Sequence, residues 1–241
     1  MLASNRCTSS FRGMLNAGIL TWERAGLNRL ILTAACLLLY GTPVQADRFS
    51  DIKFRAEQGY ADAQYELGRM FVTGRGVSQN DAEAIKWFQK AAEQGVVDAQ
   101  YSLGVMYANG DGVEENDTEA ARWFQKAAEQ GIKEAQYELG VMYASGVGVE
   151  ENDAESARWY LKAAEQGVVY AQYNLGIIYA QGKGVPQDSA EAYVWSSLAA
   201  KFGDDEAIYN RDLSSRQLSP EALSAAQERV SSLYDEIQQR R

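Results

Sequence analysis

Three short motifs in this sequence combine residue types that support chemistry in other proteins. The adjacent carboxylates Glu114-Glu115 and Glu150-Glu151 are of the type that glycoside hydrolases use as acid and base. The segment Asn109-Gly110-Asp111-Gly112, which further acids follow, is similar to a calcium-binding loop. Gly74-Arg75-Gly76 has the glycine content of a loop that binds phosphate.

None of these motifs meets the requirements of its chemistry. The two carboxylate pairs occupy equivalent places in an internal repeat, so duplication of the segment accounts for both. If Gly112 is the obligatory glycine of a calcium loop, its first and last ligand positions are Tyr107 and Thr118, where acids are required. No Gly-Lys-Ser/Thr follows Gly74-Arg75-Gly76, so we interpret these glycines as a turn between helices.

The amino-acid composition excludes most other classes of catalytic site. The 241 residues include no histidine, which excludes catalysis by serine–histidine and cysteine–histidine pairs and zinc sites with histidine ligands. The two cysteines, Cys7 and Cys36, precede the region that we expect to fold. A formal net charge of −10 argues against binding to nucleic-acid phosphates. We therefore predict a protein that is not an enzyme and has no catalytic, cofactor-binding or metal-binding residues.

Residues 1–46 have the organisation of a secretory signal peptide. A basic segment precedes the apolar run 30–40, and small residues at 44 and 46 suit cleavage after Ala46. The run is shorter than the roughly 20 residues that a membrane-spanning helix needs. We therefore predict a periplasmic or secreted protein that begins at Asp47. The alternatives are an uncleaved N-terminal anchor, a lipoprotein that uses Cys36, and a true start at Met14.

An internal repeat of 36 residues organises the rest of the chain. The tetrapeptide Ala-Glu-Gln-Gly begins at Ala56, Ala92, Ala128 and Ala164, and a degenerate copy begins at Ala200. Leu-Gly pairs and single tryptophans recur in the same phase. After a lead-in at 47–55, the predicted divisions are repeats 56–91, 92–127, 128–163 and 164–199, then a degenerate fifth unit with a capping helix at 200–241.

Each repeat is predicted to form two helices. In the first copy, the first helix has the apolar stripe Ala63, Leu67, Met70 and Phe71. Gly74 ends it, and Asn80 with Glu83 has the spacing of a capping box that begins the second helix. The second helix, which Gly95 ends, has the apolar stripe Ala84, Trp87, Phe88 and Ala91. In the second copy, we expect Trp123 to be almost completely buried.

The C-terminal segment is predicted to close the stack of repeats. Residues 204–216 can form the first helix of the fifth unit. Ser219-Pro220-Glu221 then has the residues that favour a helix start. Apolar residues follow at alternating spacings of three and four, at Leu223, Ala226, Val230, Leu233 and Ile237. The polar opposite face suits the terminal cap that a repeat array needs.

The recurring pattern over residues 56–199 resembles the Sel1-like repeat, a relative of the tetratricopeptide repeat. In the second copy, the matching residues are Ala99, Leu103, Gly104, Tyr107, Gly110, Gly112, Val113, Ala120, Trp123, Ala127, Ala128, Glu129, Gln130 and Gly131. The resemblance implies an all-α fold, namely a right-handed α/α superhelical solenoid of tandem helix hairpins. It also implies a role in assembling other proteins, often in the bacterial envelope.

One face of each first helix is the predicted partner-binding surface. At 100° per residue, Tyr65 and Arg69 lie on the side opposite Ala63 and Leu67. In tetratricopeptide-like stacking, this side lines a concave groove. The candidate contacts are Tyr65, Tyr101, Tyr137, Tyr173, Arg69, Asn109 and Gln181. Alternatively, each tyrosine packs against the first helix of the next repeat, and the two interpretations are compatible.

Together these features predict an exported, non-enzymatic scaffold that binds an envelope or secreted protein. We expect no nucleic-acid partner. After cleavage of the signal peptide, we expect no membrane span. The resemblance leaves a second class open, a cell-wall-active or penicillin-recognising hydrolase, by analogy with distant secreted relatives. A scaffold for polysaccharide assembly is the third interpretation.

Overall fold

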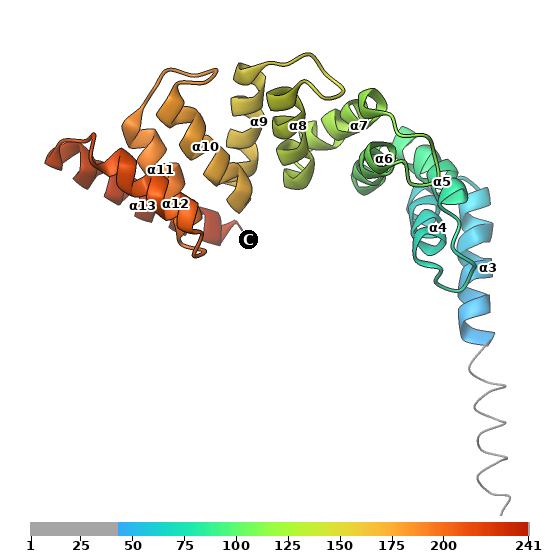
Figure 1. The fold of residues 1–241 in the computed structure, drawn as a ribbon. Coiled ribbons are helices and arrows are strands. Elements are labelled where there is room, and N and C mark those ends of the chain that lie inside the picture. The colour runs from blue at the N-terminus through green and yellow to red at the C-terminus, as the bar shows by residue number, and fades with distance from the viewer. Residues whose placement is uncertain (1–42, 241) are drawn as a thin grey trace, which may run out of the picture. The chain divides into compact units, whose positions relative to one another are not determined.

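The computed structural model of the protein describes residues 43–240, and every regular element in that range is an α-helix (Figure 1). The chain divides into two units, residues 1–50 and residues 51–241. In the first unit, the described residues 43–50 belong to the beginning of helix α3. The predicted signal peptide lies outside the described residues except for its last four positions, 43–46, which are helical.

The helices of the second unit form consecutive hairpins. The bounds of all the described helices are α3 Pro43–Glu57, α4 Ala61–Thr73, α5 Asp81–Glu93, α6 Val97–Asn109, α7 Asp117–Glu129, α8 Lys133–Ser145, α9 Asp153–Glu165, α10 Val169–Gln181, α11 Ser189–Ala200, α12 Asp205–Ser215 and α13 Pro220–Gln239. The pairs α4/α5, α6/α7, α8/α9 and α10/α11 pack as hairpins, and each hairpin packs on the next. Gly74 and Gly95 have positive φ just after α4 and α5, as predicted. The prediction of an all-α solenoid of helix hairpins is confirmed.

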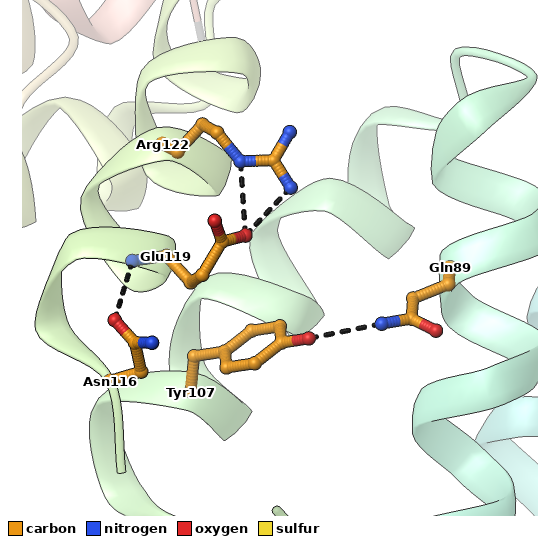
Figure 2. A network of polar contacts seen from close by, with 5 residues as sticks. All are labelled: Gln89, Tyr107, Asn116, Glu119 and Arg122. Atoms are coloured by element: carbon orange, nitrogen blue, oxygen red, sulfur yellow. Dashed lines mark hydrogen bonds and ion pairs between the residues drawn. The ribbon is translucent and has the colours of Figure 1, made fainter. Parts of the chain in front are cut away.

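Asparagine caps begin the second helices of the first three repeats, as predicted. At α7, the Asn116 side chain accepts a hydrogen bond from the Glu119 N–H at 3.0 Å (Figure 2). The reciprocal half of the capping box is absent, because the Asn116 N–H donates to the Tyr107 carbonyl at 2.9 Å. The Glu119 carboxylate instead pairs with Arg122 at 2.7 Å. Figure 2 also shows the Gln89 side chain of α5 donating to the Tyr107 hydroxyl at 3.0 Å, which joins two repeats.

A glycine beneath an aromatic ring brings the two helices of a hairpin close together. In the second repeat, a Cβ at Gly104 of α6 would lie 2.5 Å from the ring of Phe124 in α7. The Leu-Gly pairs of the sequence therefore mark the positions where the second helix touches the first. In the fourth repeat, Ser196 takes the place of the ring, opposite Gly176.

The tryptophans join each repeat to the one before it. Trp123 is 3% exposed, as expected, and belongs to the same core as Phe88 and Leu103 of the preceding helices α5 and α6. Trp159 has the equivalent place in the core of α7 and α8. Trp87 is only partly buried, because no complete hairpin precedes it.

A ladder of buried glutamines also connects the repeats, and the apolar stripes do not predict it. Gln100 is 5% exposed, and its side-chain N–H donates to the Ala92 carbonyl at 3.2 Å. Its side-chain carbonyl accepts a hydrogen bond from Gln130 at 2.7 Å. Gln64 and Gln136 repeat this arrangement one repeat before and one repeat after. The paired bonds satisfy amides that would otherwise be buried at a cost.

The ladder stops at the fourth repeat. Gln172 donates to the Ala164 carbonyl at 3.1 Å, but its buried Oε1 accepts no hydrogen bond from any described residue. Phe202 stands where the earlier repeats have the donating glutamine, and its side chain is 54% exposed. The degenerate tetrapeptide at Ala200 is therefore the physical end of the glutamine ladder.

Helix α13 covers the last hairpin. It begins as predicted, with the Ser219 hydroxyl accepting from the Ala222 N–H at 3.2 Å. Its buried side chains Ala226, Val230 and Ile237 join Trp195 and Leu198 of α11 in one core. Because α13 packs mainly on α11 rather than on α12, the fifth unit is a single first helix followed by a cap.

Candidate functional site

A pocket of about 410 Å³ lies between α4 and α6, the first helices of the first two repeats. Its aromatic and aliphatic lining comprises Tyr65, Val72, Phe88, Tyr101, Val105 and Met106. Its polar lining comprises Arg69, Thr73, Gln79, Asp81, Ser102 and Asp111. Apolar atoms supply most of the exposed wall, and walls of this kind with placed polar groups are typical of a binding pocket.

A small residue is among those that line this space. Ser102 of α6 lines the pocket together with Tyr65 and Tyr101, which stand one repeat apart. The residues in phase with Ser102 are larger in the next two repeats, namely Glu138 on α8 and Asn174 on α10. We expect these larger side chains to fill the equivalent space between the later first helices.

The row of tyrosines has a fifth member that the sequence analysis missed. Tyr209 and Leu213 of α12 come 36 residues after Tyr173 and Ile177, and they are 66% and 42% exposed. Their spacing was the available signal, but Arg211-Asp212 replaces the Leu-Gly pair that marks the other first helices. We name as the tyrosine face the surface formed by Tyr65, Tyr101, Tyr137, Tyr173 and Tyr209 with the residues four positions after each.

The first three tyrosines are partly buried because each packs on its own hairpin. The ring centroids are 5.6 Å apart for Tyr65 and Phe88, 5.8 Å for Tyr101 and Phe124, and 5.8 Å for Tyr137 and Tyr160. The expectation that this side points away from the core of its own repeat is therefore only partly met. The glycine three positions after each tyrosine lets the ring of the second helix lie beside it. Each of these three tyrosine side chains remains partly exposed to solvent.

The alternative packing, onto the next first helix, occurs toward the C-terminal end of the face. The ring of Tyr137 lies 6.3 Å from that of Tyr170 on α10. The Tyr173 hydroxyl donates to the Glu206 carboxylate of α12 at 2.6 Å. This hydrogen bond is the main reason that the pKa of Tyr173 is raised to about 12.

Two predicted polar contacts reach the pocket. Arg69 is exposed, and its guanidinium lies 5.8 Å from the Tyr65 ring centroid and 3.6 Å from the Glu66 carboxylate. The Asn109 side chain donates to the carboxylate of Asp111 at 3.2 Å, and Asp111 lines the pocket. A cation and acids thus lie together among the apolar walls.

The structure brings together only part of the predicted set. Tyr65, Arg69 and Tyr101 line the pocket, and Asn109 acts on it through Asp111. The other three predicted contacts belong to later repeats and do not line it, namely Tyr137, Tyr173 and Gln181. Gln181 is exposed at the end of α10.

Acidic groups contribute to the raised pKa values of the tyrosines in the middle of the tyrosine face. Burial raises the pKa of Tyr101, and the carboxylates of Glu138 and Glu134 raise it further. Glu138 also raises the pKa of Tyr137, after the larger effect of burial. Burial raises the pKa of the Glu138 carboxyl itself. No ion pair and no side-chain hydrogen bond among the described residues involves Glu138.

The motifs with possible chemistry lie mostly at the surface of the part of the chain that the structure describes. The carboxylate pairs Glu114-Glu115 and Glu150-Glu151 are exposed in loops. No group of three His, Cys, Asp or Glu side chains in residues 43–240 is placed to hold a metal ion. Among the described helices, none has both the length and the apolar character needed to cross a bilayer.

One Ser-x-x-Lys spacing, of the type that penicillin-recognising enzymes use, occurs at Ser50 and Lys53. Both side chains are exposed on α3. The Lys53 ammonium lies 3.8 Å from the carboxylate of Glu57.

Comparison with known protein families gives a match over four segments. The model of the Sel1 repeat matches residues 61–96, 97–132, 133–168 and 169–204. These segments begin with the first helix of each hairpin, whereas the divisions predicted from the tetrapeptide begin five residues earlier. No curated protein matches the chain.

Two solved structures are similar to the chain. A protective antigen present in uropathogenic Escherichia coli strains, which displays an SLR fold, is 37% identical, with a TM-score of 0.64 over 79% of this chain and 40% of that one. A Sel1 repeat protein from Oxalobacter formigenes is 37% identical, with a TM-score of 0.61 over 68% of this chain and 48% of that one. The chain thus spans less than half the length of either relative. Sel1 repeat proteins are generally scaffolds for protein interactions. The four matched repeats and the likeness to these structures show that the chain belongs to the Sel1 repeat family.

Proposed function

We propose that this protein is an exported, non-enzymatic scaffold whose tyrosine face binds an extended segment of another envelope or secreted protein. The observation that carries the proposal is the pocket of about 410 Å³ between α4 and α6. Two repeats contribute equivalent tyrosines, Tyr65 and Tyr101, to its walls.

The size and chemistry of the pocket favour a side chain over a small polar metabolite. Its volume is near the lower end of the roughly 300–1,000 Å³ of ligand sites, and most of its lining is apolar. Tyrosine offers a large, rigid surface with a polar tip, which is why it is common where protein segments bind. The family's general role as an interaction scaffold supports the same class of ligand.

Export is supported by the organisation of residues 1–46. Cleavage after Ala46 would remove four arginines and one glutamate and change the formal net charge from −10 to −13. N-terminal sequencing of the native protein tests this part directly. We expect a start at Asp47 in a periplasmic or extracellular fraction, and a start before Leu30 in a membrane fraction would refute it.

Capture from envelope extracts tests the binding function. The wild-type protein, a Tyr65→Ala/Tyr101→Ala variant and a Tyr60→Ala control should be compared, because Tyr60 is exposed outside the tyrosine face. We expect the double variant to lose a captured protein that the control retains. Equal capture by all three would show that the pocket does not bind the partner.

The non-enzymatic part of the proposal has its own test. The purified protein should neither hydrolyse nitrocefin nor form a covalent adduct with labelled penicillin. Turnover or an adduct that Ser50→Ala abolishes would contradict it and favour the hydrolase alternative.

A further inference from the structure

The loop that follows a first helix touches the start of the second helix in the preceding repeat. A Cβ at Gly112, after α6, would lie 2.4 Å from the backbone of Asp81, the first residue of α5. A Cβ at Gly184, after α10, would lie 2.3 Å from the backbone of Asp153, the first residue of α9. The residue before each of these glycines therefore has the same place relative to the aspartate.

The residue types at this contact differ along the array. Between the third and fourth repeats, the Lys183 ammonium lies 3.0 Å from the Asp153 carboxylate. Between the first two repeats, Asp111 takes the position of Lys183, and Asp81 takes that of Asp153. Two carboxylates thus occupy the places where the same framework elsewhere forms an ion pair.

Neither carboxylate of the first contact forms an ion pair with a residue that the structure describes. Their side-chain partners are neutral amides. The Asn109 side chain donates to Asp111 at 3.2 Å, and the Gln79 side chain donates to Asp81 at 3.4 Å. Both aspartates line the pocket between α4 and α6. The wall of this cavity therefore has two negative charges that no described lysine or arginine pairs with.

Arg69, the basic residue among those that line the same pocket, pairs with a different acid. Its guanidinium lies 3.6 Å from the carboxylate of Glu66, which does not line the pocket. Because the charge of Arg69 is shared with a carboxylate outside the pocket, the lining keeps an excess of negative charge. A cationic group of a partner would be attracted to it.

From this arrangement we infer that Asp81 and Asp111 receive the ammonium group of a lysine of the bound segment. The inference rests on the proposed function and specifies its partner as a segment with an apolar side chain in the pocket and a lysine close to it in sequence. Charge complementarity is one argument for this occupant. The pair of Lys183 and Asp153 is the other, because it shows that a lysine ammonium fits at this contact of the framework.

Three synthetic peptides test the inference, acetyl-Leu-Ser-Lys-amide and its two longer forms with one and two further serines. An extended chain advances about 3.3 Å per residue, so the set covers a range of distances between the pocket and the carboxylates. Each peptide has a counterpart with Nε-acetyllysine, which keeps the aliphatic stem of lysine and removes its charge. Binding should be measured by NMR titration of the purified wild-type protein, Asp111→Lys and a matched control, Val147→Lys.

The two variants make the same change at two junctions. Each places a lysine opposite the first residue of a preceding second helix, which is Asp81 for position 111 and Asp117 for position 147. Both should raise the melting temperature by about 1–2 °C through a pair like that of Lys183. Only Asp111→Lys alters the pocket, since Val147 does not line it.

We expect the best lysine peptide to bind wild type and Val147→Lys about threefold to fivefold more tightly than its acetyllysine counterpart. Asp111→Lys should reduce this ratio to about one or below, because its own lysine takes the place of the peptide's lysine.

Three results would contradict this. Equal affinities of the charged and acetylated peptides for wild type, both weakened by Tyr65→Ala/Tyr101→Ala, would overturn the lysine contact and leave the proposed function standing. An equal fall of the ratio in Val147→Lys would also overturn it, because the overall charge of the protein would then be the cause. Absence of any shift at the resonances of the pocket residues would count against both proposals.

Discussion

The middle repeats and the C-terminal end of the same array differ at a few side chains, and these differences change both the packing and the hydrogen bonds. In α4 to α9, each tyrosine of the first helix lies beside an aromatic ring that rests on a glycine. Each buried glutamine there accepts a hydrogen bond from the glutamine at the end of the second helix of its own hairpin. In α10 to α12, Ser196 replaces the ring and Phe202 replaces the glutamine. In this part of the array, the Tyr173 hydroxyl donates to the Glu206 carboxylate, and the buried Oε1 of Gln172 accepts no hydrogen bond from any described residue.

The residues of one repeat therefore have two different roles. The alanines, glycines, glutamines and tryptophans that recur unchanged make the contacts that join helices and repeats. The positions that vary between repeats, such as Ser102 and Glu138, decide whether the surface carries a pocket or a charge. Binding specificity can therefore change without altering the framework.

The largest effect is expected in the middle of the framework. Trp123→Ala should destabilise the protein by about 3–5 kcal/mol, because it removes a buried indole and leaves a cavity. Since repeats are stabilised by their neighbours, the loss should also split one thermal transition into two. Circular dichroism melts check this, with Trp87→Ala as the matched control, whose smaller loss reflects partial burial. A Trp123→Ala melt like that of wild type would contradict the account of the core.

The second effect concerns the cap at the C-terminal end. Deleting residues 219–241 removes Ala226, Val230 and Ile237 from the core around Trp195. We expect a loss of about 2–4 kcal/mol from the exposed apolar area, together with aggregation. Thermal unfolding with light scattering measures both. A truncated chain that stays monomeric with an unchanged melt would show that α13 is not a cap.

A third change should make the C-terminal end more like the middle. Phe202→Gln places an amide donor where the earlier repeats have one, opposite the unsatisfied carbonyl of Gln172. We expect a stabilisation of about 1 kcal/mol, measured by urea unfolding. Phe202→Glu is the matched control, because an ionised carboxylate has the same shape but no N–H to donate. Equal stability of the two variants would mean that Gln172 needs no partner.

The smallest effect concerns the hydroxyl of Tyr173. Its raised pKa means that the folded protein holds this proton more tightly than the unfolded chain does. The hydrogen bond to Glu206 therefore contributes stability below about pH 10, which should be lost as the pH rises to about 12. Because the group is exposed, we expect only a few tenths of a kcal/mol. The difference in free energy of unfolding between wild type and Tyr173→Phe should shrink over that pH range, and a constant difference would contradict this.

The repeated framework could be predicted from the sequence because each feature recurs four times in phase. The caps at Asn80 and Asn116 and the burial of Trp123 followed from local spacing alone. The glutamine ladder could not be predicted in this way, because a polar residue on an apolar helix does not reveal which residue will form a hydrogen bond with it. The pocket could not be predicted either, since its walls come from two first helices that only tertiary packing brings together.

The claim that the pocket of the tyrosine face binds a protein segment can be tested with Ser102→Glu. The chain itself has glutamate at the equivalent position of the next repeat, Glu138, so the substitution should fold with a stability within about 0.5 kcal/mol of wild type. The longer side chain should fill the pocket between Tyr65 and Tyr101. Calorimetric titration with the captured partner should then show at least a tenfold loss of affinity. Unchanged affinity in a variant with a wild-type melt would contradict the claim.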